Sequence, residues 1–369
     1  TGTAVVMVAD SEPIRGLGVQ LTGQGRLLIP SLGLDLIANG LTPAEAQGCA
    51  LLLSHADQLD DADMPTYGDD SWREYCDAAG ALRGELVHPR DTDPDTLTEA
   101  ATTVIPVPDV EVLAVAATTV EDLQQLAPLV PDHVRAKVEA SDPALDADLA
   151  AWAAGTRPLL RLLGPIQART GTTGDPITVA KRKAFYTELL AFLALHPHGV
   201  SIDQVVDAFN TDADQMRVHL SKVRKWLGID PSTGSPYLPE ATKSPAAIAR
   251  GMGIYQTVGV LSDVDLFRRL RTRGQARGAD GLADLQSALR LVTGEPFTGQ
   301  RERGWGWLAD GVRVDQHMVC AVVDVAHLVA ITALHTGDLK VARNACETAM
   351  LAAPYEDTPR LDLAAVVAA

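Results

Sequence analysis

The chain has 369 residues, of which 46% are hydrophobic, and its 31 Lys and Arg residues against 48 Asp and Glu residues give a formal net charge of −17. This length predicts two or three domains, and the negative charge excludes a protein that binds nucleic acid over its whole surface. No run of about eighteen apolar residues is present, so we expect these residues to make no membrane span and no membrane contact.

The charge is distributed unevenly along the chain. Residues 1–156 carry 7 basic against 26 acidic residues, residues 157–228 carry 10 against 6, and residues 229–369 carry 14 against 16. One short basic segment therefore lies inside an acidic protein. A local basic face of this kind can bind phosphate groups while acidic flanks limit non-specific binding.

The N-terminal residues predict a strand over 3–8, a hairpin over 20–30 that turns at a Gly-Gln-Gly sequence, and a capped helix from about 42 to 58. We interpret residues 1–57 as the tail of a mixed α/β domain. No P-loop follows the first strand, so no phosphate site is expected there. Because the first residue is Thr1, we expect the chain to be a fragment of a longer protein.

Residues 58–156 are predicted to be an acidic linker followed by connector elements. The stretch 57–109 is rich in Asp, Pro, Thr and Gly, without the alternating Asp pattern of a calcium loop, and we interpret it as solvated. A strand over 110–116 and three short helices follow, at Thr118–Ala127, Pro131–Ala140 and Ala144–Ala153. The four cysteines have no metal-ligand spacing, so we expect no metal and a reducing, cytoplasmic location, with Cys346 as a small buried residue.

A different pattern begins at residue 157. Short strand-like runs occupy 159–163, 166–169 and 177–179, and a helix is predicted over Lys181–His196. Ser201 then caps a short helix that ends near residue 210, and a third helix begins at Thr211–Asp212. Three such helices joined by tight turns are typical of a helix-turn-helix core.

The third helix is amphipathic and basic. Its apolar stripe is formed by Met216, Leu220, Val223 and Leu227, and the opposite side carries Arg217, Ser221, Arg224 and Lys225. Two interpretations remain open: a solvated surface helix, or a helix that reads DNA.

For the second interpretation, the candidate DNA contacts come from this helix and its surroundings. Arginines and lysines contact phosphates or base edges, Val218 contacts a thymine methyl group, and Ser221 contacts a phosphate. The full candidate set is Arg217, Val218, Ser221, Lys222, Arg224, Lys225, Lys181, Arg182 and Arg250. For Lys181–Lys183 a solvated first helical turn is the alternative, and His219 is expected to be packed in the core.

Three stretches resemble known regulators. Val218–Leu227 resembles the recognition helix of OmpR-type winged-helix proteins, and Arg250–Tyr255 resembles the strand that closes their wing. Leu160–Pro165 resembles the start of the N-terminal sheet of SARP-like bacterial transcriptional activators. The resemblance implies a winged helix over 157–260. The long segment 231–252 departs from the family pattern, and we expect it to block DNA binding if it covers the basic helix.

The last third resembles the helical domain of the same activators. The resemblance is carried by Ser262–Phe267, Ala288–Phe297, Trp305 and Trp307. Independently, small residues and a terminating proline at 337–354 have the spacing of one tetratricopeptide repeat (TPR). We therefore predict an all-α, TPR-like domain over 261–369. The arginines between 268 and 277 are interpreted as a solvated helix face rather than a second nucleic-acid patch.

Together these observations predict a cytoplasmic transcriptional regulator. It would bind double-stranded DNA through the winged helix and would use the TPR-like domain for a homodimer, RNA polymerase or another protein. The alternative is a protein-interaction scaffold that does not bind DNA, within a larger and possibly membrane-tethered signalling protein. We expect no catalysis and no cofactor, because GxSxG, HExxH and P-loop motifs are absent.

Overall fold

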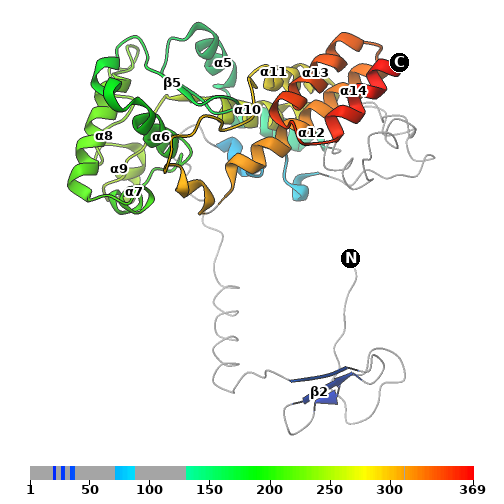
Figure 1. Ribbon diagram of the computed structural model, residues 1–369, viewed down its shortest axis with the longest axis horizontal. Helices are drawn as coiled ribbons and strands as arrows, with labels where there is room; N and C mark the ends of the chain where they lie inside the picture. Colours follow the sequence, from blue (N-terminus) through cyan, green and yellow to red (C-terminus); the bar gives the residue numbers. More distant parts are fainter. Residues whose placement is uncertain (1–19, 22–25, 30–33, 38–70, 88–129, 311) are drawn as a thin grey trace. The chain divides into compact units, whose positions relative to one another are not determined.

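The computed structural model describes residues 20–21, 26–29, 34–37, 71–87, 130–310 and 312–369 (Figure 1). The chain divides into two compact units, Thr1–Pro65 and Thr66–Ala369. We describe each unit by itself.

The first unit contains a three-stranded antiparallel sheet of β1 (Gln20–Leu21), β2 (Arg26–Ile29) and β3 (Leu34–Ile37). Gln20 pairs with Leu28, which confirms the hairpin predicted over 20–30. Strand β3, which we did not predict, pairs with β2 over its whole length. The strand predicted at 3–8 and the helix predicted at 42–58 lie outside the described residues.

The second unit is mostly helical and contains one small sheet. Its α-helices are α4 (Asp132–Ser141), α5 (Leu145–Ala154), α6 (Lys183–Ala194), α7 (Ile202–Phe209), α8 (Ala213–Leu227), α9 (Pro245–Arg250), α10 (Asp263–Arg277), α11 (Leu282–Leu289), α12 (Val314–His335), α13 (Leu339–Ala352) and α14 (Thr358–Ala368). Helices α4 and α5 confirm two of the predicted connector helices. The predicted strand at 110–116 and helix at 118–127 lie outside the described residues.

The small sheet joins two places that are about one hundred residues apart in the chain. Strand β4 (Leu159–Arg161) pairs antiparallel with β5 (Gln167–Arg169) and parallel with β6 (Leu261–Ser262). The segment that contains α6 to α9 therefore starts and ends at adjacent strands. The predicted domain boundaries at 157 and 260 fall near these strands and stay predictions, because one continuous hydrophobic core extends to both sides of them.

The residues predicted as a third strand-like run, 177–179, form part of a 3-10 helix instead, η4 (Pro176–Arg182). Asp175 accepts a hydrogen bond from the Ile177 amide, and Pro176 occupies the first helical position, where its fixed φ is compatible with a helix. This local capping overrides the β-branched composition of Ile177–Val179.

Residues 71–87 correct the prediction of a solvated linker. Two 3-10 helices, η2 (Ser71–Tyr75) and η3 (Gly84–Leu86), place Trp72, Cys76 and Leu82 in the interior. The Leu82 amide donates to the side chain of Gln275 on α10 (2.8 Å). Because three apolar side chains are buried here, this part of the acidic region belongs to the packed body.

Helices α12, α13 and α14 pack on one another at the C-terminal end (Figure 1). Small residues of α13, among them Ala342, Cys346 and Ala349, are buried, which confirms the buried position predicted for Cys346. Helix α12 is long and apolar enough to cross a membrane, but 67% of its most apolar window is buried inside the protein. It is a core helix of this unit.

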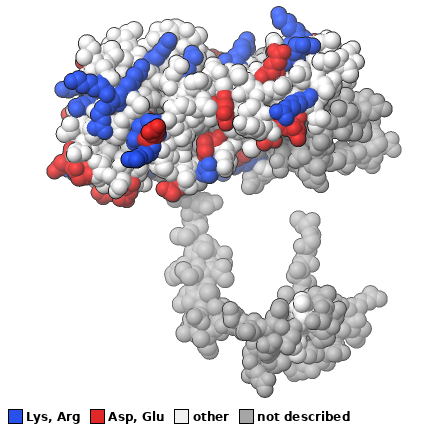
Figure 2. Space-filling view, viewed as in Figure 1, with Lys and Arg blue, Asp and Glu red and all other residues white. Residues whose placement is uncertain are grey.

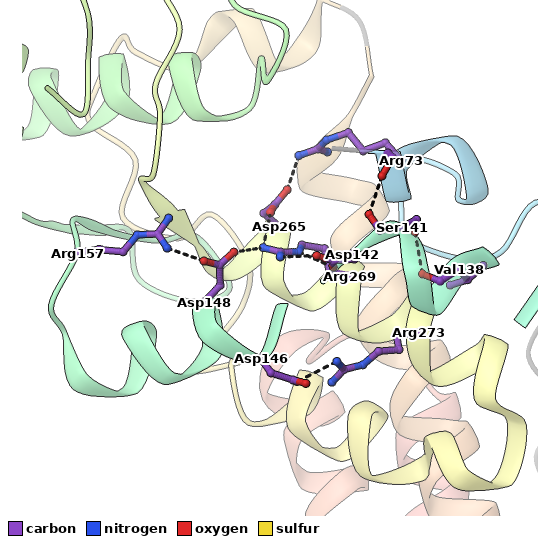
Figure 3. Close-up of polar contacts among 11 residues, drawn as sticks. Arg73, Val138, Ser141, Asp142, Asp146, Asp148, Arg157, Asp265, Arg269 and Arg273 are labelled. Carbon is purple, nitrogen blue, oxygen red and sulfur yellow. Dashed lines mark hydrogen bonds and ion pairs between the residues drawn. The ribbon is translucent and has the colours of Figure 1, made fainter. Parts of the chain in front are cut away.

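The arginines of α10 correct a second prediction. Arg269 and Arg271 are only 6% and 4% exposed, although we expected a solvated face. Arg269 forms ion pairs with Asp142 (2.7 Å) and Asp148 (2.6 Å), two residues at the α4–α5 turn and on α5 (Figure 3). Arg269 is therefore an internal ion-pair partner of the acidic segment that precedes β4, whereas Arg271 pairs with Asp324 of α12 (2.9 Å).

Candidate nucleic-acid interface

Helix α8 is fixed at both ends. At its start the Asp212 side chain accepts a hydrogen bond from the Gln215 amide (2.8 Å), an N-cap that satisfies one of the free amides of the first turn. At its end Gly228 has φ of 81°, and a Cβ atom there would lie 2.5 Å from Thr173 Oγ1. Only glycine fits this close approach with this backbone conformation.

One side of α8 faces the core. Met216, Leu220, Val223, Trp226 and Leu227 are buried together with residues of α6 and α7. The amphipathic pattern read from the sequence is thus the packing pattern of the folded helix.

The opposite side of α8 is exposed and basic. Arg217, Val218, Lys222 and Lys225 are exposed, and Ser221 is half-buried between them. Figure 2 shows Lys and Arg atoms gathered at this end of the molecule, over α8 and the adjoining part of α6. Arg217 forms a surface ion pair with Asp214 (2.6 Å), and its side chain remains 54% exposed. The structure therefore brings together five of the six candidates on this helix.

Arg224, the sixth candidate, has a different position. Its Nε donates to the Leu238 carbonyl (2.8 Å) and its Nη2 to the Pro239 carbonyl (3.0 Å). Two donors of the guanidinium group thus hold the segment that follows α8. We assign Arg224 to the fold rather than to the open face.

The segment 231–252 leaves this face open. Tyr237 and Leu238 are buried, and Ala246 and Ala247 of α9 pack on Ile254. The Ser244 hydroxyl donates to the Ile254 carbonyl (2.7 Å), which holds α9 against the chain that returns to Val200. The exposed side chains of α8 are not covered by it. The candidate Arg250 lies exposed at the last turn of α9.

The remaining candidates, Lys181 and Arg182, are exposed where η4 passes into α6. The Arg182 guanidinium lies over the Phe185 ring, with its Cζ 4.7 Å from the ring centroid. Phe185 in turn contacts His219 of α8 at a centroid distance of 4.8 Å. Arg182 is therefore next to α8.

His219 is packed, as predicted. Its Nδ1 lies 3.1 Å from the Tyr186 hydroxyl, and its side chain is buried. Burial lowers the pKa of His219, and the positive charges of Arg182 and Lys222 lower it further. This imidazole is a core residue that has two cations close by.

Sequence reasoning missed Glu188 and its partners. Glu188 of α6 is buried and accepts hydrogen bonds from the Trp305 amide (2.6 Å) and from Trp307 Nε1 (3.3 Å), and it pairs with the Arg301 guanidinium. The one signal in the sequence is a carboxylate inside the apolar run 185–193. This contact joins α6 to the segment 301–307, which precedes α12.

Among the residues that the structure describes, no group of three or more His, Cys, Asp or Glu side chains is arranged to hold a metal ion. Comparisons with models of protein families, with curated proteins and with solved structures found no match.

Proposed function

We propose that this protein is a transcriptional regulator of the SARP-like type that binds double-stranded DNA, with α8 as the helix that enters the major groove. The observation that supports this most is the open basic face of α8, formed by Arg217, Val218, Ser221, Lys222 and Lys225. In a helix-turn-helix protein the second helix of the motif presents such a face to base edges.

The surroundings of α8 support a winged helix. Helices α6, α7 and α8 follow one another, and α7 begins with a capping box formed by Ser201 and Gln204. After α8 the chain makes a bridge between Ile229 and Pro236 and returns to Val200 at Tyr255. We propose that residues 229–255 are a wing that is enlarged by α9. Arg250 on that helix is then a candidate for a phosphate contact.

In this proposal the cations have different roles. Arg217 reads base edges and Val218 contacts a thymine methyl group, because both lie on the exposed face near the start of α8. Ser221, Lys222, Lys225, Lys181 and Arg182 contact phosphates. About four to six neutralised phosphates give a salt slope of roughly −4 to −5 in a plot of log affinity against log salt concentration.

The test is DNA binding by the full chain. Selection from a random duplex library, followed by titration of the selected duplex, should yield salt-sensitive binding. Replacing Arg217 with Ala should lower affinity and relax base preference at one position, by about 1–3 kcal/mol. Replacing Lys225 with Ala should lower affinity equally for all sequences. Lys340→Ala on α13, an exposed lysine far from α8 in the fold, is the matched control.

A second function is favoured by a different surface. The C-terminal helices and their turns carry exposed apolar side chains: Leu351, Tyr355, which is 90% exposed, and Val367. We propose that these helices bind a protein, either a second copy or a component such as RNA polymerase. If the wild-type chain selects no duplex, the alternative of a scaffold without DNA binding replaces the first proposal.

A further inference from the structure

Three cations from separate segments lie near the Phe185–His219 contact, with Arg182 and Arg301 against Phe185 and Lys222 near His219. Arg182 comes from η4, Lys222 from α8, and Arg301 from the segment before α12. The Cζ atom of Arg301 lies 5.5 Å from the centroid of the Phe185 ring that Arg182 also covers at 4.7 Å. We call these three residues the Phe185 cation cluster.

The cluster concentrates positive charge with little local compensation. Among the described residues, the carboxylate partner of the cluster is Glu188, which pairs with Arg301. Glu188 also accepts hydrogen bonds from the Trp305 amide and from Trp307 Nε1. Neither Arg182 nor Lys222 has a carboxylate partner among these residues. Like charges that lie close together repel one another, and a bound anion removes this repulsion.

The cluster lies on the flank of α8 that faces α6. His219, which contacts Phe185, stands next to Val218 and one turn before Val223, between the exposed face and the core. The major groove of DNA is about 12 Å wide, so a helix inside it has a phosphate strand on each side. The α6 flank is the side on which one of these strands would pass.

We propose that one phosphate strand of bound duplex DNA lies on the Phe185 cation cluster, so that the segment 301–303 of the helical region forms part of the DNA interface. This inference rests on the proposed function and adds a contact from outside the winged helix. Arg301 is held in place by Glu188, while Glu302 and Arg303 are exposed beside it. The segment thus presents a positive, a negative and a positive side chain in sequence.

Two single substitutions test the contact, because they should change DNA affinity in opposite directions. If phosphates lie beside the segment, Glu302→Gln removes a repulsive charge and tightens binding about two- to fivefold, whereas Arg303→Gln weakens it about three- to tenfold. Arg303→Gln also makes the salt slope shallower by about one. Both changes leave base preference unaltered, because phosphate contacts carry no sequence information directly. Both positions are exposed, so neither change removes a buried partner.

The probe is a mixed-sequence duplex of about 40 bp, roughly four helical turns, titrated with the full chain at several salt concentrations. Lys340→Gln and Glu347→Gln, two exposed residues of α13, are charge-matched controls and should not change affinity. If the two loop variants behave like these controls while Arg217→Ala still weakens binding, the inference is wrong and the proposed function stands. If both loop variants shift affinity in the same direction, a structural effect explains them and the inference is also wrong.

Discussion

Asp263 is a fully buried carboxylate at the point where β6 passes into α10. Its two oxygens accept hydrogen bonds from the Leu162 amide (2.8 and 2.9 Å), the Leu163 amide (3.0 Å) and the Val264 amide (2.9 Å). These contacts attach the end of β4 to the start of α10. Burial nevertheless raises the pKa of Asp263 to about 7, because desolvation of the charged form outweighs the amide hydrogen bonds.

This pKa predicts a pH dependence of stability. The unfolded carboxyl ionises near 3.8, while the folded protein keeps the proton until about pH 7. Between these values the folded state binds more protons than the unfolded state, so the contribution of Asp263 to the free energy of unfolding falls as pH rises, by up to a few kcal/mol. Urea unfolding at about pH 5 and about pH 7.5 should show a flatter pH dependence for Asp263→Asn than for the wild type.

The lowered pKa of His219 acts in the opposite direction, since an imidazole kept neutral in the fold stabilises the protein as pH rises through its ordinary value. His219 is present in both the wild type and Asp263→Asn, so the difference between them isolates Asp263. An equal slope for the two proteins would show that Asp263 is ionised throughout this range.

At the scale of elements, the position of α8 depends on how its last turn meets the turn at 171–175. Thr173 Oγ1 donates to the Ile229 carbonyl (2.5 Å) and accepts from the Ile229 amide (3.0 Å), and the Asp175 amide donates to the Lys225 carbonyl (3.2 Å). Gly228 lies between these contacts. The turn therefore fixes both the length and the direction of the basic helix.

Gly228→Ala should destabilise the protein by about 1–3 kcal/mol and also weaken DNA binding, because the new methyl group displaces Thr173 and with it the end of α8. Gly337→Ala, between α12 and α13, is the matched control. Gly337 has a similar positive φ of 79°, but no atom lies within 4 Å of a Cβ built there. We expect it to cost about 1 kcal/mol, measured by urea unfolding, with DNA affinity unchanged. Equal effects of the two substitutions on affinity would contradict this role of the turn.

The elements differ in how far the sequence predicts them. Helices α7 and α8 follow from the caps at Ser201 and Asp212 and, for α8, from an apolar stripe at spacings of three and four residues, because both signals are local in the sequence. The packing of residues 71–87 could not be predicted, since Trp72, Cys76 and Leu82 are separated by polar residues and are buried by contact with the distant helices α4 and α10. The composition indicates that this stretch is acidic, but it does not indicate that the stretch packs on the arginine-rich helix α10.

The sequence likewise predicted part of the candidate site and missed another part. Arg217, Lys222 and Lys225 occupy the exposed side that the helical period assigns to them. The helical period assigns Arg224 to the same side. Its guanidinium group instead donates to the carbonyls of Leu238 and Pro239, which belong to the segment after the helix. Long-range partners of this kind have no signature in the periodicity of a single helix.

At the scale of the second unit, residues 71–87 and 130–157 pack with the residues after β6 as one body around α10. Arg269 binds Asp142 and Asp148, Arg157 binds Asp148 (2.5 Å), and Arg73 binds Asp265 (Figure 3). Because β4 and β6 are adjacent, the segment from α6 to α9 leaves this body and returns to it at one place. The proposed DNA-binding region is thus an insertion into the helical unit rather than one member of a linear series.

This topology predicts that residues 157–369 are not an independent folding unit, although the sequence suggested a separable linker before them. Without residues 1–156, Arg269 loses both Asp142 and Asp148, and Arg273 loses Asp146. Breaking a buried pair by removal of one partner costs about 3–5 kcal/mol, so we expect the shortened chain to unfold at much lower urea concentration than the full chain.

Substituting Met for Arg269 distinguishes the loss of its ion pairs with Asp142 and Asp148 from a general loss of packing. In the full chain Arg269→Met leaves Asp142 and Asp148 without their partner and should destabilise the protein. In the shortened chain α4 and α5 no longer cover Arg269, and Asp265 remains beside it (3.7 Å), so the same substitution should change stability little. Urea unfolding of all four proteins, followed by circular dichroism, measures both effects. A shortened chain as stable as the full chain, or one that Arg269→Met further destabilises, would mean that the acidic segment does not complete the core around α10.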